Sequence, residues 1–196
     1  MFSGIVAATG RIRKAERRKA GLRLTVDAGT LPLRDVAIGD SIALNGVCLT
    51  VVARARKGFG VDVSRETLRC TVGLDEPGEI NLEKALRMSD RLGGHLVSGH
   101  VDGVGKVTHL GRAGADCLLR VRAPRGLARY IARKGSIAVH GVSLTVNAVN
   151  GTRFAVNLIP HTLNVTAFRD FLPGAKVNLE VDIIARYLAR LAEFDR

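Results

Sequence analysis

The sequence predicts an all-β protein built from two tandem copies of one small antiparallel barrel of the Greek-key type, followed by a C-terminal α-helix. The first observation is a repeat: Gly46-Val47-Cys48-Leu49-Thr50-Val51 recurs as Gly141-Val142-Ser143-Leu144-Thr145-Val146, 95 residues later (141 − 46). The second is that residues 59–63 align with 154–158 at the same offset. The third is a series of short strand patterns between turn signals. A repeat of this length matches a whole small domain.

The first unit contains the following expected elements in order. Residues 2–8 form a short apolar, β-compatible run, and residues 21–26 alternate apolar and polar side chains with the period of a half-buried strand. Asn45-Gly46 divides residues 41–53 into two strands, because this dipeptide favours a type I′ hairpin turn. Further elements are expected as a strand at 59–63, a short helical turn at 65–68 and a strand at 79–82.

The second unit repeats this order after a glycine-rich connector, Leu92-Gly93-Gly94-His95. Its strands are expected at 97–107, 117–121, 136–149, 154–158 and 176–181. After Asp182, apolar residues recur at helical spacing at Ile184, Leu188 and Leu191, with Tyr187 beside them. Because so short a helix is marginal alone, it must pack on its own barrel or on the same helix of other subunits, and we favour the second. The expected domains are 1–95, 96–183 and an oligomerisation helix at 184–196.

Composition excludes several function classes. The net charge is +12, and a basic cluster runs through residues 11–23, but no aromatic residue is interleaved for base stacking. We therefore favour a solvated hairpin tip over a polyanion site and expect no nucleic-acid partner. Three cysteines without a C-x-x-C pair argue against a disulfide framework or a metal site. No apolar run is long enough to span a membrane, so we expect a cytoplasmic protein with no membrane partner.

Four motifs in order resemble riboflavin synthase of the α-chain type. They are Phe2-Ser3-Gly4-Ile5-Val6, the segment Asn45-Gly46-Val47-Cys48-Leu49-Thr50-Val51, the segment 93–103 (GGHLVSGHVDG), and Gly141-Val142-Ser143-Leu144-Thr145-Val146-Asn147. The resemblance covers residues 1 to about 187. It implies a cofactor-free transferase that catalyses the final step of riboflavin biosynthesis. Two molecules of 6,7-dimethyl-8-ribityllumazine exchange a four-carbon unit, which gives riboflavin and 5-amino-6-ribitylaminouracil.

The resemblance also implies a homotrimer, in which the N-barrel of one subunit and the C-barrel of the next together hold the two lumazines of one site. It leaves open an association with lumazine synthase. A tandem repeat suits this reaction because two copies of one substrate need two related pockets. Orientation of the two reactants and proton transfer at an acidic methyl group would supply most of the catalysis.

Site residues carried over from the family fall into three groups. The N-barrel pocket would use Phe2, Gly4, Ile5, Val6, Cys48, Leu49, Thr50, Asp62, Val63, Ser64, Arg65, Glu66 and Thr67. The C-barrel pocket would use Gly99, His100, Val101, Lys134, Ser143, Leu144, Thr145, Asn157, Leu158, Ile159, Pro160, His161 and Thr162. Proton handling would fall to Cys48, His100, Ser143, Thr145 and Asp182.

Each candidate also has a structural interpretation. Cys48 can be a small buried hydrophobe, and Ser143 and Thr145 can satisfy backbone groups beside the turn. His100 can be a satisfied strand histidine, and Asp182 can cap the C-terminal helix. Lys134 can be a solvated cation and Phe2 a core residue.

His140 departs from the family, because many members carry Asp immediately before the second Gly-x-Ser. A histidine titrates near neutrality, so the exchange bears on acid/base roles at this position. Two rival functions follow from other features: a non-catalytic lumazine-binding antenna protein of the same fold, and a basic OB-type nucleic-acid binder. Retention of His100, Ser143 and Thr145 in the second copy favours the enzyme over the antenna protein.

Overall fold

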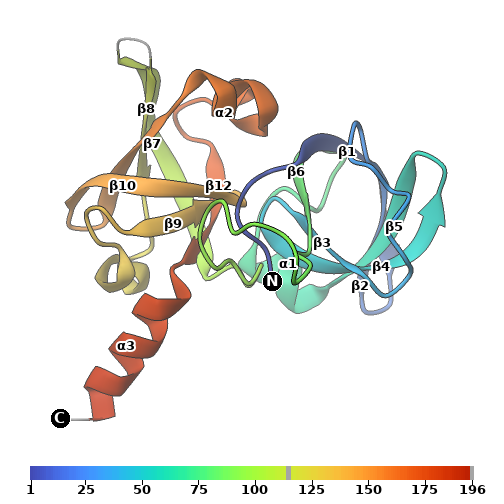
Figure 1. Ribbon diagram of the computed structural model, residues 1–196, viewed down its shortest axis with the longest axis horizontal. Coiled ribbons are helices and arrows are strands. Elements are labelled where there is room, and N and C mark those ends of the chain that lie inside the picture. Colours follow the sequence, from blue (N-terminus) through green and yellow to red (C-terminus); the bar gives the residue numbers. More distant parts are fainter. Residues whose placement is uncertain (114–115, 195–196) are drawn as a thin grey trace.

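The computed structural model describes residues 1–113 and 116–194 and shows two closed antiparallel barrels lying side by side, with one helix projecting from the second barrel (Figure 1). The first barrel consists of β1 (Ala8–Arg18), β2 (Gly21–Asp27), β3 (Ser41–Leu44), β4 (Val47–Ala55), β5 (Gly58–Ser64) and β6 (Gly78–Lys84). The second consists of β7 (Gly103–Ala113), β8 (Asp116–Arg122), β9 (Ser136–Val139), β10 (Val142–Asn150), β11 (Arg153–Leu158) and β12 (Lys176–Val181). The helices are α1 (Arg65–Cys70), α2 (Pro160–Val165) and α3 (Ile183–Phe194), with 3₁₀ turns η1 (Arg125–Tyr130) and η2 (Ala167–Asp170).

The predicted fold class is confirmed. The strands of the first barrel neighbour one another in the order β1-β2-β5-β4-β3-β6, and those of the second follow the same order from β7 to β12. The pairings β2–β5 and β3–β6 join strands that are not consecutive, as in Greek-key connections. Even the β-bulges repeat: the register shift between Ile12 and Lys14 recurs between Val107 and His109, 95 residues later (107 − 12).

Two expected strands begin later than the sequence predicts. Phe2 forms a single antiparallel bridge with Val97, whereas the continuous ladders start only at Ala8 and Gly103. Gly4 and Gly99 explain the difference, because both have positive φ angles (75° and 79°) that interrupt an extended strand. The segments 1–7 and 85–102 therefore run between the barrels, and the domain limits at 95 and 183 remain a prediction.

The helix content is slightly higher than expected. The helical turn predicted at 65–68 is confirmed as α1, and its repeat mate α2 was missed although it begins at Pro160, a residue suited to the first helical turn. η1 and η2 were also missed. No helix in the described ranges 1–113 and 116–194 is long and apolar enough to cross a membrane.

A polar network related by the internal repeat joins the two barrels. The N–H of Asn45 donates to Asn81 O (2.9 Å), and the N–H of His140 donates to Asn178 O (2.7 Å). The side-chain amide of Asn81 reaches across to His140 O (2.9 Å), and that of Asn178 reaches across to Asn45 O (3.0 Å). Each barrel thus satisfies the buried turn of the other.

His140 therefore belongs to the barrel junction. It occupies the position equivalent to Asn45, has the same left-handed φ (52° against 50°), and accepts a hydrogen bond at Nδ1 from the Asn178 N–H (3.3 Å). Asn45 Oδ1 accepts the matching bond from the Asn81 N–H (2.9 Å). The departure from the family at this position consequently concerns how the barrels meet.

Gly46 and Gly141 bring these two turns into direct contact, and Gly141→Ala is expected to destabilise the fold. A Cβ at Gly141 would lie 2.6 Å from Gly46 N, and its φ of 84° disfavours any side chain. The left-handed backbone costs about 1 kcal/mol and the backbone overlap about another. We expect the free energy of unfolding to fall by roughly 2 kcal/mol in urea denaturation. Gly151→Ala is the control, because it has positive φ (58°) with open space around it, and an equal loss there would contradict the junction argument.

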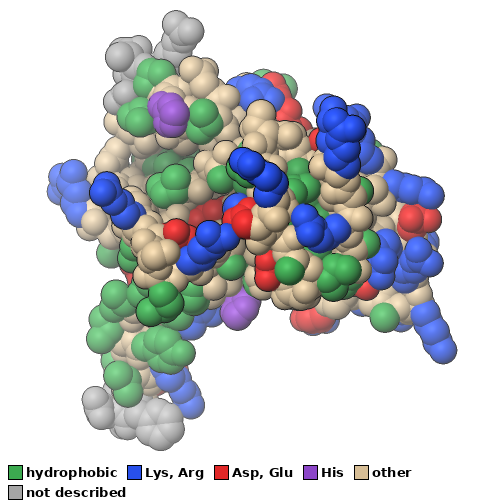
Figure 2. All heavy atoms as spheres, turned by 45° about the vertical axis from the view of Figure 1, so that its right-hand side comes forward, with side chains coloured by type: hydrophobic (Ala, Val, Ile, Leu, Met, Phe, Trp, Pro, Cys, Tyr) green, Lys and Arg blue, Asp and Glu red, His purple; other side chains and the backbone are tan. Residues whose placement is uncertain are grey.

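The basic cluster follows the β1–β2 hairpin, as the hairpin interpretation predicts. Figure 2 shows Lys and Arg side chains spread over the first barrel, with acidic groups among them. Arg13 pairs with Asp27 (2.7 Å), Lys14 pairs with Glu16 (3.0 Å), and Arg23 pairs with Asp62. The first and third pairs join neighbouring strands and the second lies along β1. Charge neutralisation of this kind is typical of a solvated sheet surface.

Candidate active site

Two glycine segments cross to the opposite barrel, where they meet Ser143 and Cys48, and we name these two meeting points the Ser143 pocket and the Cys48 pocket as candidate binding sites. The N–H of Ser143 donates to Gly4 O (2.7 Å), and the N–H of Cys48 donates to Gly99 O (2.9 Å). Both glycines are required by space, since a Cβ at either position would lie 2.6 Å from the Cβ of its partner, Ser143 or Cys48. Backbone polar groups and a small side chain are thus held together at each pocket.

The pairing of segments differs from the grouping that the sequence suggested. Gly4, Ile5 and Val6 were grouped with Cys48, but the structure places Gly4 beside Ser143 of the second barrel. Val6 accordingly packs on the core of the second barrel, and Val101 packs on the core of the first. The sequence could not show that each segment contacts the opposite barrel. Aligning the two repeats identifies equivalent positions, but it does not indicate which of the two barrels a segment packs against.

The Ser143 pocket contains a serine–histidine pair that the sequence reasoning missed. His95 Nδ1 lies 2.7 Å from Ser143 Oγ, and the N–H of His95 donates to Ser3 O (3.1 Å). Burial is the main cause that lowers the pKa of His95, against the raising effects of Asp182 and then Glu180. Its Nε2 is the one buried side-chain polar atom in the described ranges without a partner. A neutral imidazole with an unpaired nitrogen can take or give a proton.

Asp182 has a local structural role as well. Its Oδ1 accepts a hydrogen bond from the Ile184 N–H (3.0 Å) at the start of α3, which is the capping interpretation. Its carboxylate nevertheless acts electrostatically on His95. Asp182 therefore remains a candidate for proton handling through the histidine.

Several candidates on the first barrel already have partners. Asp62 pairs with Arg23 across β5 and β2, and this guanidinium holds the pKa of Asp62 below its usual range. Ser64 caps α1 by accepting from the Thr67 N–H (3.0 Å). Glu66 pairs with Arg69 (2.8 Å). Thr50 and Arg65 are exposed, whereas the side chains of Leu49 and Val63 point into the barrel, so only their backbone can face a ligand.

The second barrel repeats this division. Thr145, Asn157, Ile159, Pro160 and His161 are exposed and Thr162 is half-buried. Leu144 and Leu158 belong to the core, so their side chains are not available to a ligand. His100 is exposed and its N–H donates to Ser98 Oγ (3.3 Å). Lys134 is exposed at a left-handed turn (φ 67°).

Phe2 is fully buried and lies in a small cluster between the barrels with Ala43, Val97 and Ala138, against which Cys48 packs. The core interpretation of Phe2 therefore holds for its position. It still borders the Cys48 pocket, because its ring comes within 3.0 Å of a Cβ built on Gly99.

Two cavities are lined in part by candidate residues, although neither lining includes Cys48 or Ser143. One of about 740 Å³ is lined by Ser3, Ile5, Ser41 and Glu83 together with the charged side chains of Asp40 and Arg91. Another of about 660 Å³ lies beside Asp62, Val63 and Ser64. Within residues 1–113 and 116–194, no group of three or more His, Cys, Asp or Glu is arranged to hold a metal ion. The three cysteines are free, and Cys48 is half-buried.

A second repeat in the sequence contains Glu83 and Glu180, to which the sequence analysis assigned no role. Asn81-Leu82-Glu83 and Asn178-Leu179-Glu180 repeat at an offset of 97 (180 − 83). All four polar side chains of these triplets are buried and hydrogen-bonded to backbone. His95 had no such signal, because it lies in the glycine-rich connector between the repeated motifs.

The comparisons with known proteins match both barrels to one family. The family described as lumazine binding domain matches residues 3–85 and 98–182, one copy for each barrel. The riboflavin synthase of Photobacterium phosphoreum is 44% identical over 198 residues, covering 100% of this chain and 91% of that protein. The riboflavin synthase of Brucella abortus is 42% identical over 203 residues, covering all of both chains. That of Bacillus subtilis is 38% identical over 192 residues, covering 97% of this chain and 89% of that protein.

Solved structures share the fold. LumP complexed with 6,7-dimethyl-8-(1'-D-ribityl) lumazine superimposes with a TM-score of 0.78 at 23% identity, covering 92% of this chain and 99% of that one. LumP complexed with riboflavin gives a TM-score of 0.80 at 24% identity, with the same coverage. The chain therefore belongs to the lumazine-binding-domain family, and its full-length relatives place it among the riboflavin synthases.

Proposed function

We propose that the chain catalyses the dismutation of two molecules of 6,7-dimethyl-8-ribityllumazine into riboflavin and 5-amino-6-ribitylaminouracil. The atoms of the two substrates balance those of the two products, so the four-carbon transfer requires no oxidant, reductant or resident cofactor. The observation that carries the proposal is the pair of equivalent crossed contacts, of Cys48 with Gly99 and of Ser143 with Gly4. Each pocket would hold one lumazine.

The two pockets are equivalent in backbone but differ in chemistry. Only the Ser143 pocket has a histidine within hydrogen-bond distance of its small polar side chain. Because burial keeps His95 neutral, it can accept a proton from Ser143 or from the lumazine methyl group. The Cys48 pocket would bind the second lumazine by shape and backbone contacts. This asymmetry suits a reaction in which one molecule donates carbon atoms and an identical molecule accepts them.

Exposed hydroxyl and amide side chains beside each pocket suit the ribityl chain. Thr50 and Ser64 lie on the first barrel, and Thr145, which matches Thr50, and Asn157, which matches Asp62, lie on the second. Hydroxyl groups both donate and accept hydrogen bonds, as the ribityl hydroxyls do. The Asp62 carboxylate would accept a hydrogen bond from a ribityl hydroxyl, either in place of its ion pair with Arg23 or in addition to it.

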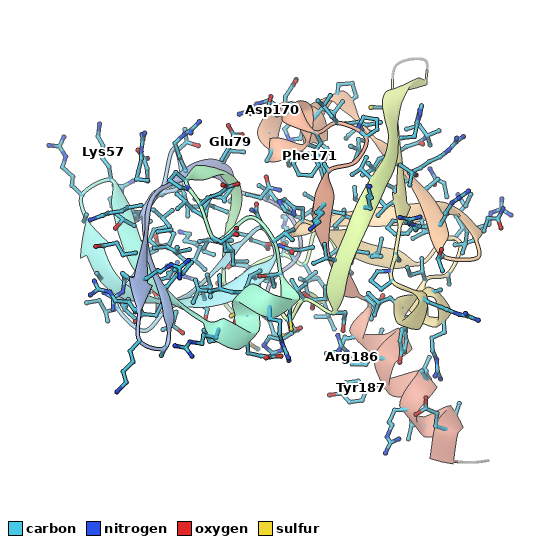
Figure 3. The ribbon with its side chains drawn as sticks, turned by 180° about the vertical axis from the view of Figure 1, so that it is seen from behind. Lys57, Glu79, Asp170, Phe171, Arg186 and Tyr187 are labelled. Atoms are coloured by element: carbon cyan, nitrogen blue, oxygen red, sulfur yellow. The ribbon has the colours of Figure 1, made fainter. Side chains whose placement is uncertain are left out.

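The proposed assembly is a homotrimer held together by α3, with working sites between subunits. α3 leaves an apolar stripe in solvent: Ile184, Tyr187, Leu188 and Leu191 are 59–65% exposed. Figure 3 shows Tyr187 projecting sideways from α3 below the barrels, and Figure 2 shows apolar side chains gathered at this end of the molecule. The opposite face of α3 is anchored by Arg186 to Asp102 (2.7 Å). The same helix of other copies fits this stripe. Association with a lumazine synthase is a further proposal, left to direct measurement.

Mixing the purified chain with 6,7-dimethyl-8-ribityllumazine alone, without nucleotide, metal or cofactor, is expected to produce riboflavin. The increase in riboflavin absorbance follows the reaction, and 5-amino-6-ribitylaminouracil should form in equal amount. Heat-denatured protein is the control. Saturable lumazine binding with no product would refute the enzyme and support a binding protein of the antenna class.

A further inference from the structure

Two buried glutamates occupy equivalent positions on the last strand of each barrel. Glu83 lies on β6 and Glu180 on β12, with 7% and 3% of their surface exposed. Carboxylates are rarely buried to this extent unless they accept several hydrogen bonds. Neither has a cation among its hydrogen-bond partners, so their role must be sought in the groups they bind.

Each carboxylate binds a serine–glycine pair. Glu83 Oε1 accepts from the N–H and the Oγ of Ser3 (both 2.7 Å), and its Oε2 accepts from the N–H of Gly4 (3.0 Å). Glu180 Oε1 accepts from the N–H and the Oγ of Ser98 (both 2.6 Å), and its Oε2 accepts from the N–H of Gly99 (3.0 Å). Three donors converge on each glutamate with the same geometry.

The bound segments then contact the opposite barrel. Gly4, held by Glu83 of the first barrel, accepts the N–H of Ser143 in the second. Gly99, held by Glu180 of the second barrel, accepts the N–H of Cys48 in the first. The carbonyl of Ser3 also accepts the N–H of His95. Each glutamate is therefore connected through its segment to the pocket of the other barrel.

We propose that Glu83 and Glu180 are positioning residues that act crosswise: Glu83 sets the Ser143 pocket and Glu180 sets the Cys48 pocket. The assignment of these pockets to lumazine rests on the proposed function above. The glutamates touch no reacting atom. They determine where the carbonyl groups and Cα atoms of Gly4 and Gly99 lie. The position of these atoms in turn determines how the ring of each bound lumazine is oriented.

Only a carboxylate satisfies all three donors. Burial raises the pKa of Glu83, while the hydrogen bonds from Ser3 and Gly4 act in the opposite direction. Glutamine at either position keeps one acceptor oxygen and turns an NH₂ group towards another donor. One buried N–H is then left without an acceptor, which favours local opening of the segment.

Thiol reactivity measures this opening without reference to turnover. A Cys70→Ser chain retains Cys48, which Gly99 covers, and Cys117, which is buried. A second reporter chain carries Cys48→Ser, Cys70→Ser and Ser143→Cys, and its introduced thiol is covered by Gly4 in the same way. Iodoacetamide alkylation, followed by mass spectrometry of the peptides, gives the rate at each position.

The expected pattern is crossed. Glu180→Gln should increase alkylation at Cys48 about tenfold and leave the thiol introduced by Ser143→Cys within about twofold, and Glu83→Gln should do the reverse. Glu76→Gln, a change at an exposed carboxylate, is the control and should alter neither rate. An equal increase at both thiols, or no change at either, would overturn the proposal.

Milder variants cover the case in which a glutamine variant does not fold. Ser3→Ala and Ser98→Ala each remove one hydroxyl donor from the same carboxylates, and each should raise only the rate of the thiol assigned to its glutamate. Lumazine titration, monitored by ligand fluorescence, is a separate experiment. Either Glu83→Gln or Glu180→Gln should weaken the affinity of one of the two lumazine sites about tenfold and leave the affinity of the other unchanged. A crossed alkylation pattern in a chain that binds no lumazine would refute the proposed function and leave the positioning role intact.

Discussion

A chain carrying Leu188→Asp and Leu191→Asp is expected to bind lumazine but to lose at least about a hundredfold of its turnover. Both side chains are more than 60% exposed on α3, so their replacement removes little packing within the chain. Negative charges on a helix stripe that packs against copies of itself would prevent assembly. Without assembly, the two lumazines no longer meet in one site, and the reaction loses the advantage of two oriented reactants, which can exceed this factor.

Sedimentation velocity, lumazine titration and riboflavin formation on the same samples check this expectation. The control chain carries Ile38→Asp and Leu172→Asp, two equally drastic changes at exposed apolar residues outside α3 (66% and 73%). It should keep the oligomeric state and the turnover of the unmodified chain. A monomer with full turnover would disprove the intersubunit site, and an intact oligomer in the α3 variant would disprove the role of the stripe.

Most of the fold could be predicted because the repeat is visible in the sequence itself. The 95-residue offset placed β3, β4 and β5 on their counterparts β9, β10 and β11, and an offset of 97 placed β6 on β12. The turn at Asn45-Gly46 divided β3 from β4 as expected. These features depend on local preferences: alternation of apolar side chains, and positive φ at Asn and Gly. The strand starts predicted at residues 2 and 97 were wrong, and the strands begin at Ala8 and Gly103. The bends at Gly4 and Gly99 that delay them are set by contacts with the other barrel.

The site was predictable in its residue types and less so in its connections. Cys48, Ser143, Gly4 and Gly99 lie at the pockets, but the exchange of segments between barrels depends on long-range hydrogen bonds that no local pattern encodes. His95 was missed because it stands in a glycine-rich connector, outside the motifs that repeat, and its contact with Ser143 is long-range. Glu83 and Glu180 were aligned correctly yet left without a role, since a charged residue on a strand usually faces solvent.

Acidification is expected to destabilise the fold through His140. Its burial lowers the pKa to about 4, against 6.5 for an ordinary histidine. Between these two values the unfolded chain binds a proton that the folded chain does not, so the free energy of unfolding falls as the pH falls. The loss between pH 7 and pH 4 from this residue is about 3 kcal/mol. Urea denaturation at several pH values measures it.

His140→Asn isolates this contribution because the internal repeat supplies the design. Asn45 already holds the equivalent position with φ 50°, and its Oδ1 accepts the Asn81 N–H as His140 Nδ1 accepts the Asn178 N–H. Asparagine at 140 can therefore keep the left-handed turn and the acceptor while removing the titrating group.

The His140→Asn chain should match the unmodified chain near pH 7 and exceed it by about 3 kcal/mol at pH 4. All other groups that titrate in this range are common to both chains, so their contributions cancel in the difference between the two free energies of unfolding. Parallel stability curves from pH 7 to pH 4 would show that His140 is not held neutral by its burial. If the curves separate as expected while riboflavin formation is unchanged at pH 7, then the residue that departs from the family serves the junction of the barrels and is not required for proton transfer in the reaction.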